Sequence, residues 1–259
     1  MTAAPLAVLE RDGPVVRLRL NRPERHNSLV PDLLDALLRA LDTAMRDPAI
    51  GVLVLEAAGR SFSTGGDVAG FFDTPRDRRR AYAEAVVGGL NRVILALLDL
   101  PCPVVGRIHG PVTGGSLGLL LACDLVAVTP QAFLQSYYTE VGFSPDGGWT
   151  AMLPARVGEA AAREIQLLNR RVPAEEMVRL GLATALVTED MLDATVAGWT
   201  DALLAKQPGA VAATRLLLRP VAQSGRIAAG LETEKQAFMV QIETEEAHRG
   251  MARFLGRAP

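Results

Sequence analysis

The chain has 259 residues, of which 49% are hydrophobic and 22% charged, and its formal net charge is −2. This composition is typical of a globular protein, and the near-neutral charge argues against a nucleic-acid partner. The two cysteines, Cys102 and Cys123, show neither C-x-x-C nor zinc spacing, so we expect core thiols in a reducing cytoplasm.

Strand-like and helix-like patterns alternate over the first half of the chain. Val15–Leu20 alternates apolar and polar residues, which predicts a strand with one solvent-exposed face. Leucines at helical spacing follow Pro31, a residue suited to a first helical position. Further strands are predicted at 52–55, 104–108 and 125–128, and further helices at about 76–98 and 115–123. This order predicts an α/β fold with a parallel or mixed sheet.

The pattern becomes mostly helical after about residue 150. Helices are predicted over 160–168, 174–180, 191–206, 209–218 and 228–248. A break at 206–209 suggests a soft boundary near residue 200, between a core of residues 1–200 and a helical C-terminal region of residues 201–259. The late helices carry a sparse apolar stripe of Leu231, Phe238 and Ile242, which we expect the body or another subunit to cover.

No targeting, membrane or metal-binding segment is indicated. Met1–Glu10 lacks the basic and apolar regions of a signal peptide. The longest apolar run, Leu117–Val128, is interrupted by Asp124 and is too short to span a bilayer. No group of His, Asp or Glu has metal-ligand spacing. These features predict a cytoplasmic protein without a metal site.

Two glycine-rich turns, at 61–67 and 109–116, each follow a strand-like run and precede a helix-like one. Such turns leave backbone N–H groups free at a helix start. If they converge, the amides of Gly66 and Gly115 would hold one developing oxyanion. Either pair of glycines could also form only a tight turn, and Asp67 is expected to cap its own helix rather than act as a base.

Asp146 lies in a Pro-Asp-Gly-Gly sequence within a segment rich in aromatic residues. The local pattern fits a turn-forming aspartate, but it also fits a general base in an apolar pocket. Phe143 and Trp149 would supply the low dielectric. Glu140 is the other carboxylate of the segment, and its side chain could equally face solvent.

The histidines and the arginines at 76–80 are weaker candidates. His26 lies in a polar loop, and His109 is expected to be a structural donor. Arg76, Arg78, Arg79 and Arg80 fit a solvated helix face, with a phosphate contact as the alternative.

Gly114–Gly118 also matches the G-x-S-x-G nucleophile elbow of serine hydrolases, with Ser116 and His248 as triad candidates. Six residues separate the preceding strand-like run from Gly115, whereas an elbow needs a sharp turn, and His248 lies in a charged helical stretch. We therefore regard a serine hydrolase as the weak alternative.

Several segments, in this order, resemble the crotonase superfamily, also called the enoyl-CoA hydratase/isomerase family. They are Asn21–Leu29, Phe62–Asp67, His109-Gly110 with Gly114-Gly115, Ala122–Asp124, and Gly142–Gly148. The resemblance implies a spiral of ββα units with a helical C-terminal region that mediates trimerisation, and often a dimer of trimers. It implies an acyl-CoA thioester as substrate, with no cofactor beyond the coenzyme A that the substrate carries.

The resemblance also implies roles for particular residues. The thioester carbonyl would lie between the N–H groups of Gly66 and Gly115. The adenine and phosphates of CoA would lie near Arg25, Thr64, Asp67 and Val68. Typical hydratases of the family carry two catalytic glutamates, and the matching positions here are Gly118 and Tyr138.

Asp146 matches a position that carries a catalytic carboxylate in dienoyl-CoA isomerases, chlorobenzoyl-CoA dehalogenases and naphthoate synthases. The surrounding pattern also resembles epoxyphenylacetyl-CoA isomerase-like proteins. We therefore favour proton transfer by Asp146, with Tyr138 orienting the acyl chain or donating a hydrogen bond. Hydration, nucleophilic attack by Asp146, thioester hydrolysis and a catalytically weak acyl-CoA binder remain the alternatives.

Overall fold

A computed structural model describes residues 4–218 and 221–258 of the chain. Six strands form the main sheet in the order β1-β2-β3-β4-β6-β9, in which only the pair β1–β2 is antiparallel. These strands are β1 (Ala7–Asp12), β2 (Val15–Leu20), β3 (Val52–Ala57), β4 (Val104–Ile108), β6 (Leu125–Val128) and β9 (Ala185–Leu186). A smaller sheet has the order β5-β7-β8, from β5 (Val112–Thr113), β7 (Phe133–Gln135) and β8 (Val172–Pro173). The predicted α/β class with a mixed sheet is confirmed.

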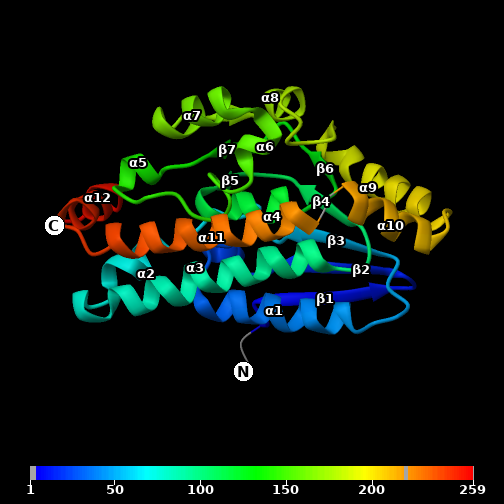
Figure 1. The fold of residues 1–259 in the computed structure, drawn as a ribbon, viewed down its shortest axis with the longest axis horizontal. Helices are drawn as coiled ribbons and strands as arrows, with labels where there is room; N and C mark the ends of the chain where they lie inside the picture. Colours follow the sequence, from blue (N-terminus) through cyan, green and yellow to red (C-terminus); the bar gives the residue numbers. More distant parts are fainter. Residues whose placement is uncertain (1–3, 219–220, 259) are drawn as a thin grey trace.

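Helices cover both faces of the main sheet. Figure 1 shows α1, α3 and α11 alongside one another, with α12 at one end of the molecule and α9 and α10 at the other. The helices of the first half are η1 (Pro23–Arg25), α1 (Pro31–Met45), α2 (Val68–Asp73), α3 (Arg76–Asp99), η2 (Gly114–Ser116), α4 (Leu117–Leu121) and α5 (Tyr138–Val141). Those of the second half are α6 (Leu153–Val157), α7 (Glu159–Leu167), α8 (Ala174–Arg179), α9 (Glu189–Leu204), α10 (Pro208–Leu218), α11 (Val221–Gln241) and α12 (Glu245–Phe254).

The apolar pattern of each strand decides its place in the sheet. Every residue of β3 is buried, as expected for a strand inside a parallel sheet with helices on both faces. In β2 the residues Val16, Leu18 and Leu20 are buried, while the alternate arginines bind Glu56 of β3. Because Glu56 is paired with these arginines, β3 continues to Ala57, two residues beyond the end that the apolar run predicted.

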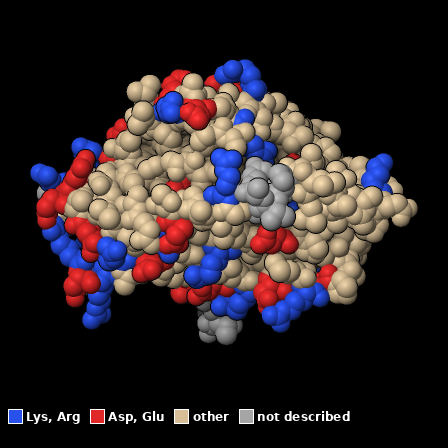
Figure 2. Space-filling view, in the orientation of Figure 1, with Lys and Arg blue, Asp and Glu red and all other residues tan. Residues whose placement is uncertain are grey.

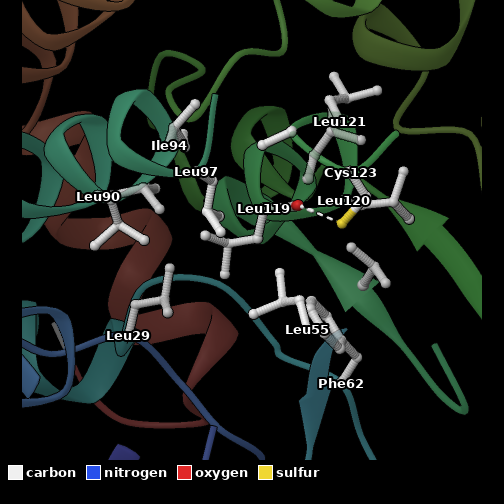
Figure 3. Close-up of a cluster of buried hydrophobic side chains, with 14 of the residues drawn as sticks. Leu29, Leu55, Phe62, Leu90, Ile94, Leu97, Leu119, Leu120, Leu121 and Cys123 are labelled. Carbon is white, nitrogen blue, oxygen red and sulfur yellow. Dashed lines mark hydrogen bonds between the residues drawn. The ribbon is translucent and has the colours of Figure 1, made fainter. Parts of the chain in front are cut away.

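The main core lies between the sheet and helices α1 and α3, and it fixes the position of α4. Figure 3 shows Leu90, Ile94 and Leu97 of α3 among the leucines of α4, with Leu55 and Phe62 below them. Cys123 donates a hydrogen bond to the carbonyl of Leu119 at 3.3 Å. Burial raises the pKa of Cys102 to about 11 and raises that of Cys123 further. Both cysteines are therefore the core thiols that the sequence predicts.

The C-terminal region differs from the sequence prediction in one element. The single helix predicted over 228–248 is two helices, because α11 ends at Gln241 and the Thr244 side chain accepts a hydrogen bond from the amide of Ala247. The boundary predicted at residue 200 falls within α9. The predicted stripe of Leu231, Phe238 and Ile242 is buried, and the body of the same chain covers it.

Among the described residues, α3 is the one helix long and apolar enough to cross a membrane. It is buried along much of its length between α1, α11 and the sheet. Its apolar character is therefore explained by its place in the core.

Candidate active site

The two glycine turns lie side by side. Ser63 of the first turn forms a parallel bridge with Val112 before the second. A Cβ atom added to Gly65 would lie 2.6 Å from the carbonyl oxygen of Thr113 and 3.1 Å from the amide nitrogen of Gly115. Gly65 also has a φ of +73°, which favours glycine. Only a residue without a side chain allows the two turns to approach this closely.

The N–H groups of Gly66 and Gly115 make no hydrogen bond to the described residues. Gly66 bridges Leu29, but the bridge uses the carbonyl of Gly65 and the amide of Asp67, so the N–H of Gly66 points away from Leu29. Gly115 lies in the first turn of η2, where N–H groups lack helical partners. Standard covalent geometry places the two amide nitrogens within about 7 Å of each other.

A cavity of about 640 Å³ opens beside these turns. Its lining includes every site residue predicted from the sequence: Arg25, Thr64, Gly66, Asp67, Val68, Gly115, Tyr138 and Asp146. These residues come from four separate segments, and the sheet order and the bridge between the turns bring them together. The predicted site is therefore one continuous surface of the folded chain.

The Asp146 carboxyl group lies against the second glycine turn. A Cβ atom added to Gly115 would lie 3.0 Å from Oδ1 and 3.4 Å from Oδ2 of Asp146. The Asp146 residue is 6% exposed. Burial raises its pKa to about 7, with a further rise from the negative charge of Glu234 and a partial offset from the hydrogen bond of Tyr138. A carboxyl group with this pKa can both accept and release a proton near neutral pH.

Tyr138 is the immediate partner of Asp146. Its hydroxyl donates a short hydrogen bond to Asp146 Oδ1 and lies 3.2 Å from the Asp146 carbonyl oxygen. Burial and the neighbouring carboxylate raise the pKa of Tyr138 well above its ordinary value. Tyr138 therefore stays protonated and acts as a donor. The Trp149 ring lies edge-on to it and donates to the Gly114 carbonyl at 2.7 Å.

Asp67 has the structural role that the sequence predicts. Its Oδ1 accepts a hydrogen bond from the Gly70 amide at 3.3 Å, which caps α2. Burial alone would raise the pKa of Asp67, but the Gly70 amide and the guanidinium groups of Arg22 and Arg25 together lower it. Arg25 lies 3.5 Å from Asp67, and its side chain is about half exposed at the cavity mouth.

Of the remaining candidates of the sequence, Glu140 and His109 have surface or structural positions, and His26 is at the cavity. Glu140 is exposed. His109 lies with its Nε2 2.7 Å from the Gly59 carbonyl oxygen, as expected of a structural donor, and burial lowers its pKa. His26 lines the cavity, with its Nδ1 3.1 Å from Ser61 Oγ. Within the described part of the chain, no group of three or more His, Cys, Asp or Glu could hold a metal ion.

The serine-hydrolase alternative is wrong. Ser116 is fully buried, and its hydroxyl lies 2.7 Å from the Thr113 carbonyl oxygen and 3.0 Å from that of Ser63, both of which can only accept its one proton. His248 lies in α12, where its ring stacks on Phe72. No histidine in the described residues hydrogen-bonds Ser116, so the serine lacks a general base.

The basic cluster at the start of α3 does not line the cavity. Arg76 and Arg80 form ion pairs with Glu245 and Glu243 of the C-terminal segment. Arg79 is buried and donates to backbone carbonyls at the end of α2. These arginines attach the tail of the chain to α2 and α3, and the alternative of a phosphate contact has no support in the structure.

Two features of the site were missed in the sequence. Phe71, Phe143 and Phe238 form a cluster on the cavity wall, with ring centroids 5.0 to 5.8 Å apart. Phe238 comes from α11, so no local pattern connects it to the other two. The second feature is Glu234, also on α11, which is buried beside the turn that follows Asp146.

A family model described as enoyl-CoA hydratase/isomerase matches residues 10–259. The chain belongs to this family. A Mycobacterium tuberculosis protein named "Probable enoyl-CoA hydratase EchA12" is 35% identical over 238 residues, which cover 90% of this chain and 82% of that protein. The 4-chlorobenzoyl coenzyme A dehalogenase-2 of Arthrobacter is 31% identical over 184 residues, covering 71% of this chain and 66% of that protein.

Solved structures with the same fold match nearly the whole chain. An enoyl-CoA hydratase from Mycobacterium avium subsp. paratuberculosis superposes with a TM-score of 0.86 at 29% identity, covering 98% of this chain and 97% of that chain. OdaA from Pseudomonas aeruginosa also gives a TM-score of 0.86, at 26% identity, covering 98% of this chain and all of that chain. These matches confirm the resemblance to the crotonase superfamily and its fold.

Proposed function

We propose that this enzyme moves a proton within an unsaturated acyl-CoA thioester and so shifts its double bond. The observation that carries the proposal is the Asp146 carboxyl group, which is buried in the cavity with its oxygens 3.0 and 3.4 Å from the position that a Cβ of Gly115 would take. A single carboxyl group with a pKa of about 7, in the same cavity as two unpaired amides, suits a proton shuttle.

The amides of Gly66 and Gly115 would bind the thioester oxygen as it becomes negatively charged. Both N–H groups are free of partners in the described chain, and the turns that carry them are in contact. Amides held in place before the reaction need no reorganisation, and each such donor contributes about 3–4 kcal/mol to transition-state stabilisation.

In the proposed reaction, ionised Asp146 accepts a proton from carbon, and the electron pair of that C–H bond moves into a dienolate. The protonated carboxyl group, whose proton can exchange with solvent at this stage, then returns a proton to a different carbon, which shifts the double bond and restores the carboxylate. Tyr138 keeps its own proton and holds Oδ1 of Asp146 through its hydrogen bond. No water or cofactor is consumed.

Hydration is the less suitable reaction for this cavity. Gly118 and Tyr138 stand where the resemblance to hydratases would expect glutamates. A Cβ atom added to Gly118 would lie 2.3 Å from Ile94 Cδ1 and 2.6 Å from the Gly147 carbonyl oxygen, so this packing has no room for a longer side chain. Tyrosine with a raised pKa is a poor base for activating water.

The cavity mouth would bind the coenzyme A part of the substrate. Arg25 is exposed there and presents a positive charge for phosphate, and Thr64, Asp67 and Val68 line the same opening. Asp67 acts here through the cap of α2 and its ion pair with Arg25. We also propose that the protein assembles as a homotrimer or as a dimer of trimers.

The test compares the wild-type protein with Asp146→Asn on a panel of 3-enoyl-CoA thioesters in D2O. Mass spectrometry measures deuterium incorporation, and chromatography separates isomerised from hydrated product. We expect deuterated, isomerised product from the wild type and at least a hundredfold slower exchange from the variant. Equal turnover by both proteins, or a hydrated product from both, would contradict the proposal. Binding without turnover across the panel would indicate an acyl-CoA-binding protein.

A further inference from the structure

Glu234 is a buried carboxylate that the reaction above does not use. It lies on α11, in the C-terminal region, and is 3% exposed. Within the described chain, no lysine or arginine forms an ion pair with it. A buried charge without a cation needs several hydrogen-bond donors to compensate for the lost water.

All four hydrogen bonds to Glu234 come from one short turn. Its Oε2 accepts from the Gly148 amide at 2.8 Å. Its Oε1 accepts from the Thr150 amide at 2.6 Å, from the Thr150 hydroxyl at 2.7 Å and from the Ala151 amide at 2.9 Å. The carboxylate therefore accepts hydrogen bonds from N–H groups of the turn that begins directly after Asp146.

The opposite side of this turn presses on the second glycine turn. A Cβ atom added to Gly147 would lie 2.4 Å from the Gly115 carbonyl oxygen. Gly147 and Gly148 both have positive φ angles, of 63° and 90°. The segment that carries Asp146 is thus held between the Gly115 backbone on one side and Glu234 on the other.

Helix α11 is itself firmly placed. Asn91 of α3 donates to the Leu231 carbonyl at 3.0 Å. One helical turn before Glu234, Gly230 allows α11 to approach Ala151, because an added Cβ would lie 2.7 Å from the Ala151 Cβ. Small residues at such a crossing fix the distance between backbones. The contacts of α11 with α3 therefore also fix the position of the turn at 147–151 that Glu234 binds.

We propose that Glu234 is a positioning residue, which holds the Asp146 carboxyl group in register with the amides of Gly66 and Gly115. The inference rests on the proposed function, because it assumes that Asp146 transfers the proton. The titratable groups that act on Asp146 are Tyr138 of α5 and Glu234 of α11. They act in opposite directions: the Tyr138 hydrogen bond lowers the pKa of Asp146, and the Glu234 charge raises it.

The test is Glu234→Gln in the full chain, assayed with 3-hexenoyl-CoA over a range of pH. Glutamine keeps the shape of the side chain, but its NH2 group cannot accept a hydrogen bond. It would face either the Gly148 amide or the donors of Thr150 and Ala151. We expect kcat to fall about tenfold to a hundredfold through misplacement of Asp146, with KM changed less than threefold. The acidic limb of kcat/KM should move to lower pH, because the variant lacks the negative charge that raises the pKa of Asp146.

Three further proteins make the result decisive. Glu232→Gln, two residues away on the exposed face of α11, should behave as the wild type. Glu234→Asp keeps the charge but shortens the reach, so it should lower kcat and leave the acidic limb in place, even if Glu234→Gln does not fold. When Asp146→Asn is inactive, either of two results overturns the inference. One is a shifted acidic limb of kcat/KM in Glu234→Asp, and the other is wild-type kinetics in Glu234→Gln. An active Asp146→Asn would instead overturn the proposed function.

Discussion

The Asp146 carboxyl group is unusual among the acidic residues of the chain because burial raises its pKa to about 7. The proposed reaction begins with its ionised form, so kcat/KM should rise as pH increases through about 7. Tyr138→Phe removes the hydrogen bond that lowers this pKa. The acidic limb of a kcat/KM profile should therefore move to higher pH in Tyr138→Phe, and an unchanged limb would argue against Asp146 as the titrating group.

The raised pKa also predicts a dependence of stability on pH. In the unfolded chain Asp146 ionises near the ordinary aspartate pKa of 3.8, and in the folded chain its pKa is about 7. Between these values the folded state binds more protons, so the contribution of Asp146 to stability falls as pH rises. Asp146→Asn removes this dependence, so at pH 8 it should unfold at a higher temperature than the wild type.

Calorimetry at two pH values checks this expectation. The advantage of Asp146→Asn should be on the order of a few kcal/mol at pH 8 and should disappear below about pH 4. A variant that is less stable than the wild type at pH 8 would show that the ionised carboxylate is well solvated in the folded state.

Much of the candidate site could be predicted from single residues. Gly66 and Gly115 lie in glycine-rich turns, and Asp146 lies in a Pro-Asp-Gly-Gly turn sequence. Such residues are characteristic of turns, so the local sequence indicates them. The Phe71–Phe143–Phe238 cluster could not be predicted, because its members come from α2, the segment after α5, and α11, which only the tertiary fold brings together. Glu234 gave no signal either, since three of its four donors are backbone amides.

At the scale of elements, apolar pattern and length together decided which parts of the fold the sequence predicted. Strand β1 has six residues but was not predicted, because its apolar first half is followed by three charged residues without alternation. Strands β2, β3, β4 and β6 have four or more residues and show a clear apolar pattern. Strands β5, β8 and β9 have two residues each, too few for any periodicity. The break between α11 and α12 was missed because residues 242–244 contain neither proline nor glycine.

The packing of α12 on α5 predicts the effect of one added methyl group. A Cβ atom at Gly250 would lie 2.0 Å from the Val141 carbonyl oxygen, so α12 must move away from α5. Because α5 carries Tyr138 and the end of α12 lines the cavity, the change should reach the site. We expect Gly250→Ala to destabilise the protein by about 1–3 kcal/mol and to raise KM for acyl-CoA.

Gly198→Ala is the matched control for this change. Gly198 also lies inside a helix, but no atom is within 4 Å of an added Cβ. Alanine there should stabilise the helix slightly and leave KM unchanged. Equal melting temperatures and KM values for the two variants would show that α12 is not tightly packed on α5.

At the scale of the whole molecule, the C-terminal region is part of the site. Phe238 and Glu234 of α11 and Phe254 at the end of α12 join residues from the first 150 positions. The division near residue 200 stays a prediction, and residues from both sides of it line the cavity. Helices α11 and α3, for example, are distant in sequence but adjacent in the fold (Figure 1).

The surface around α10 is the natural candidate for contact with other copies. Leu216, Leu217 and Leu218 are 61–80% exposed, and no residue of α10 is buried in the described chain. Figure 2 shows few charged side chains over α9 and α10, in contrast to the end of the molecule near α2 and α12. Exposed apolar surface of this kind is typical of an oligomer interface.

We therefore expect Leu217→Glu to weaken the proposed trimer. Analytical ultracentrifugation should find trimers or hexamers of the wild type and a shift toward monomer in the variant. Gly209→Ala, at an exposed position of the same helix with no atom near the added Cβ, serves as the control. A monomeric wild type at micromolar concentration would contradict the assembly.

The most direct measurement of the proposed chemistry is a crystal structure of Asp146→Asn with a bound 3-enoyl-CoA. We predict that the thioester oxygen lies about 3 Å from the amide nitrogens of both Gly66 and Gly115. The side chain at position 146 should face the carbon that loses its proton. A thioester oxygen bound away from either amide, or an acyl chain remote from residue 146, would contradict it.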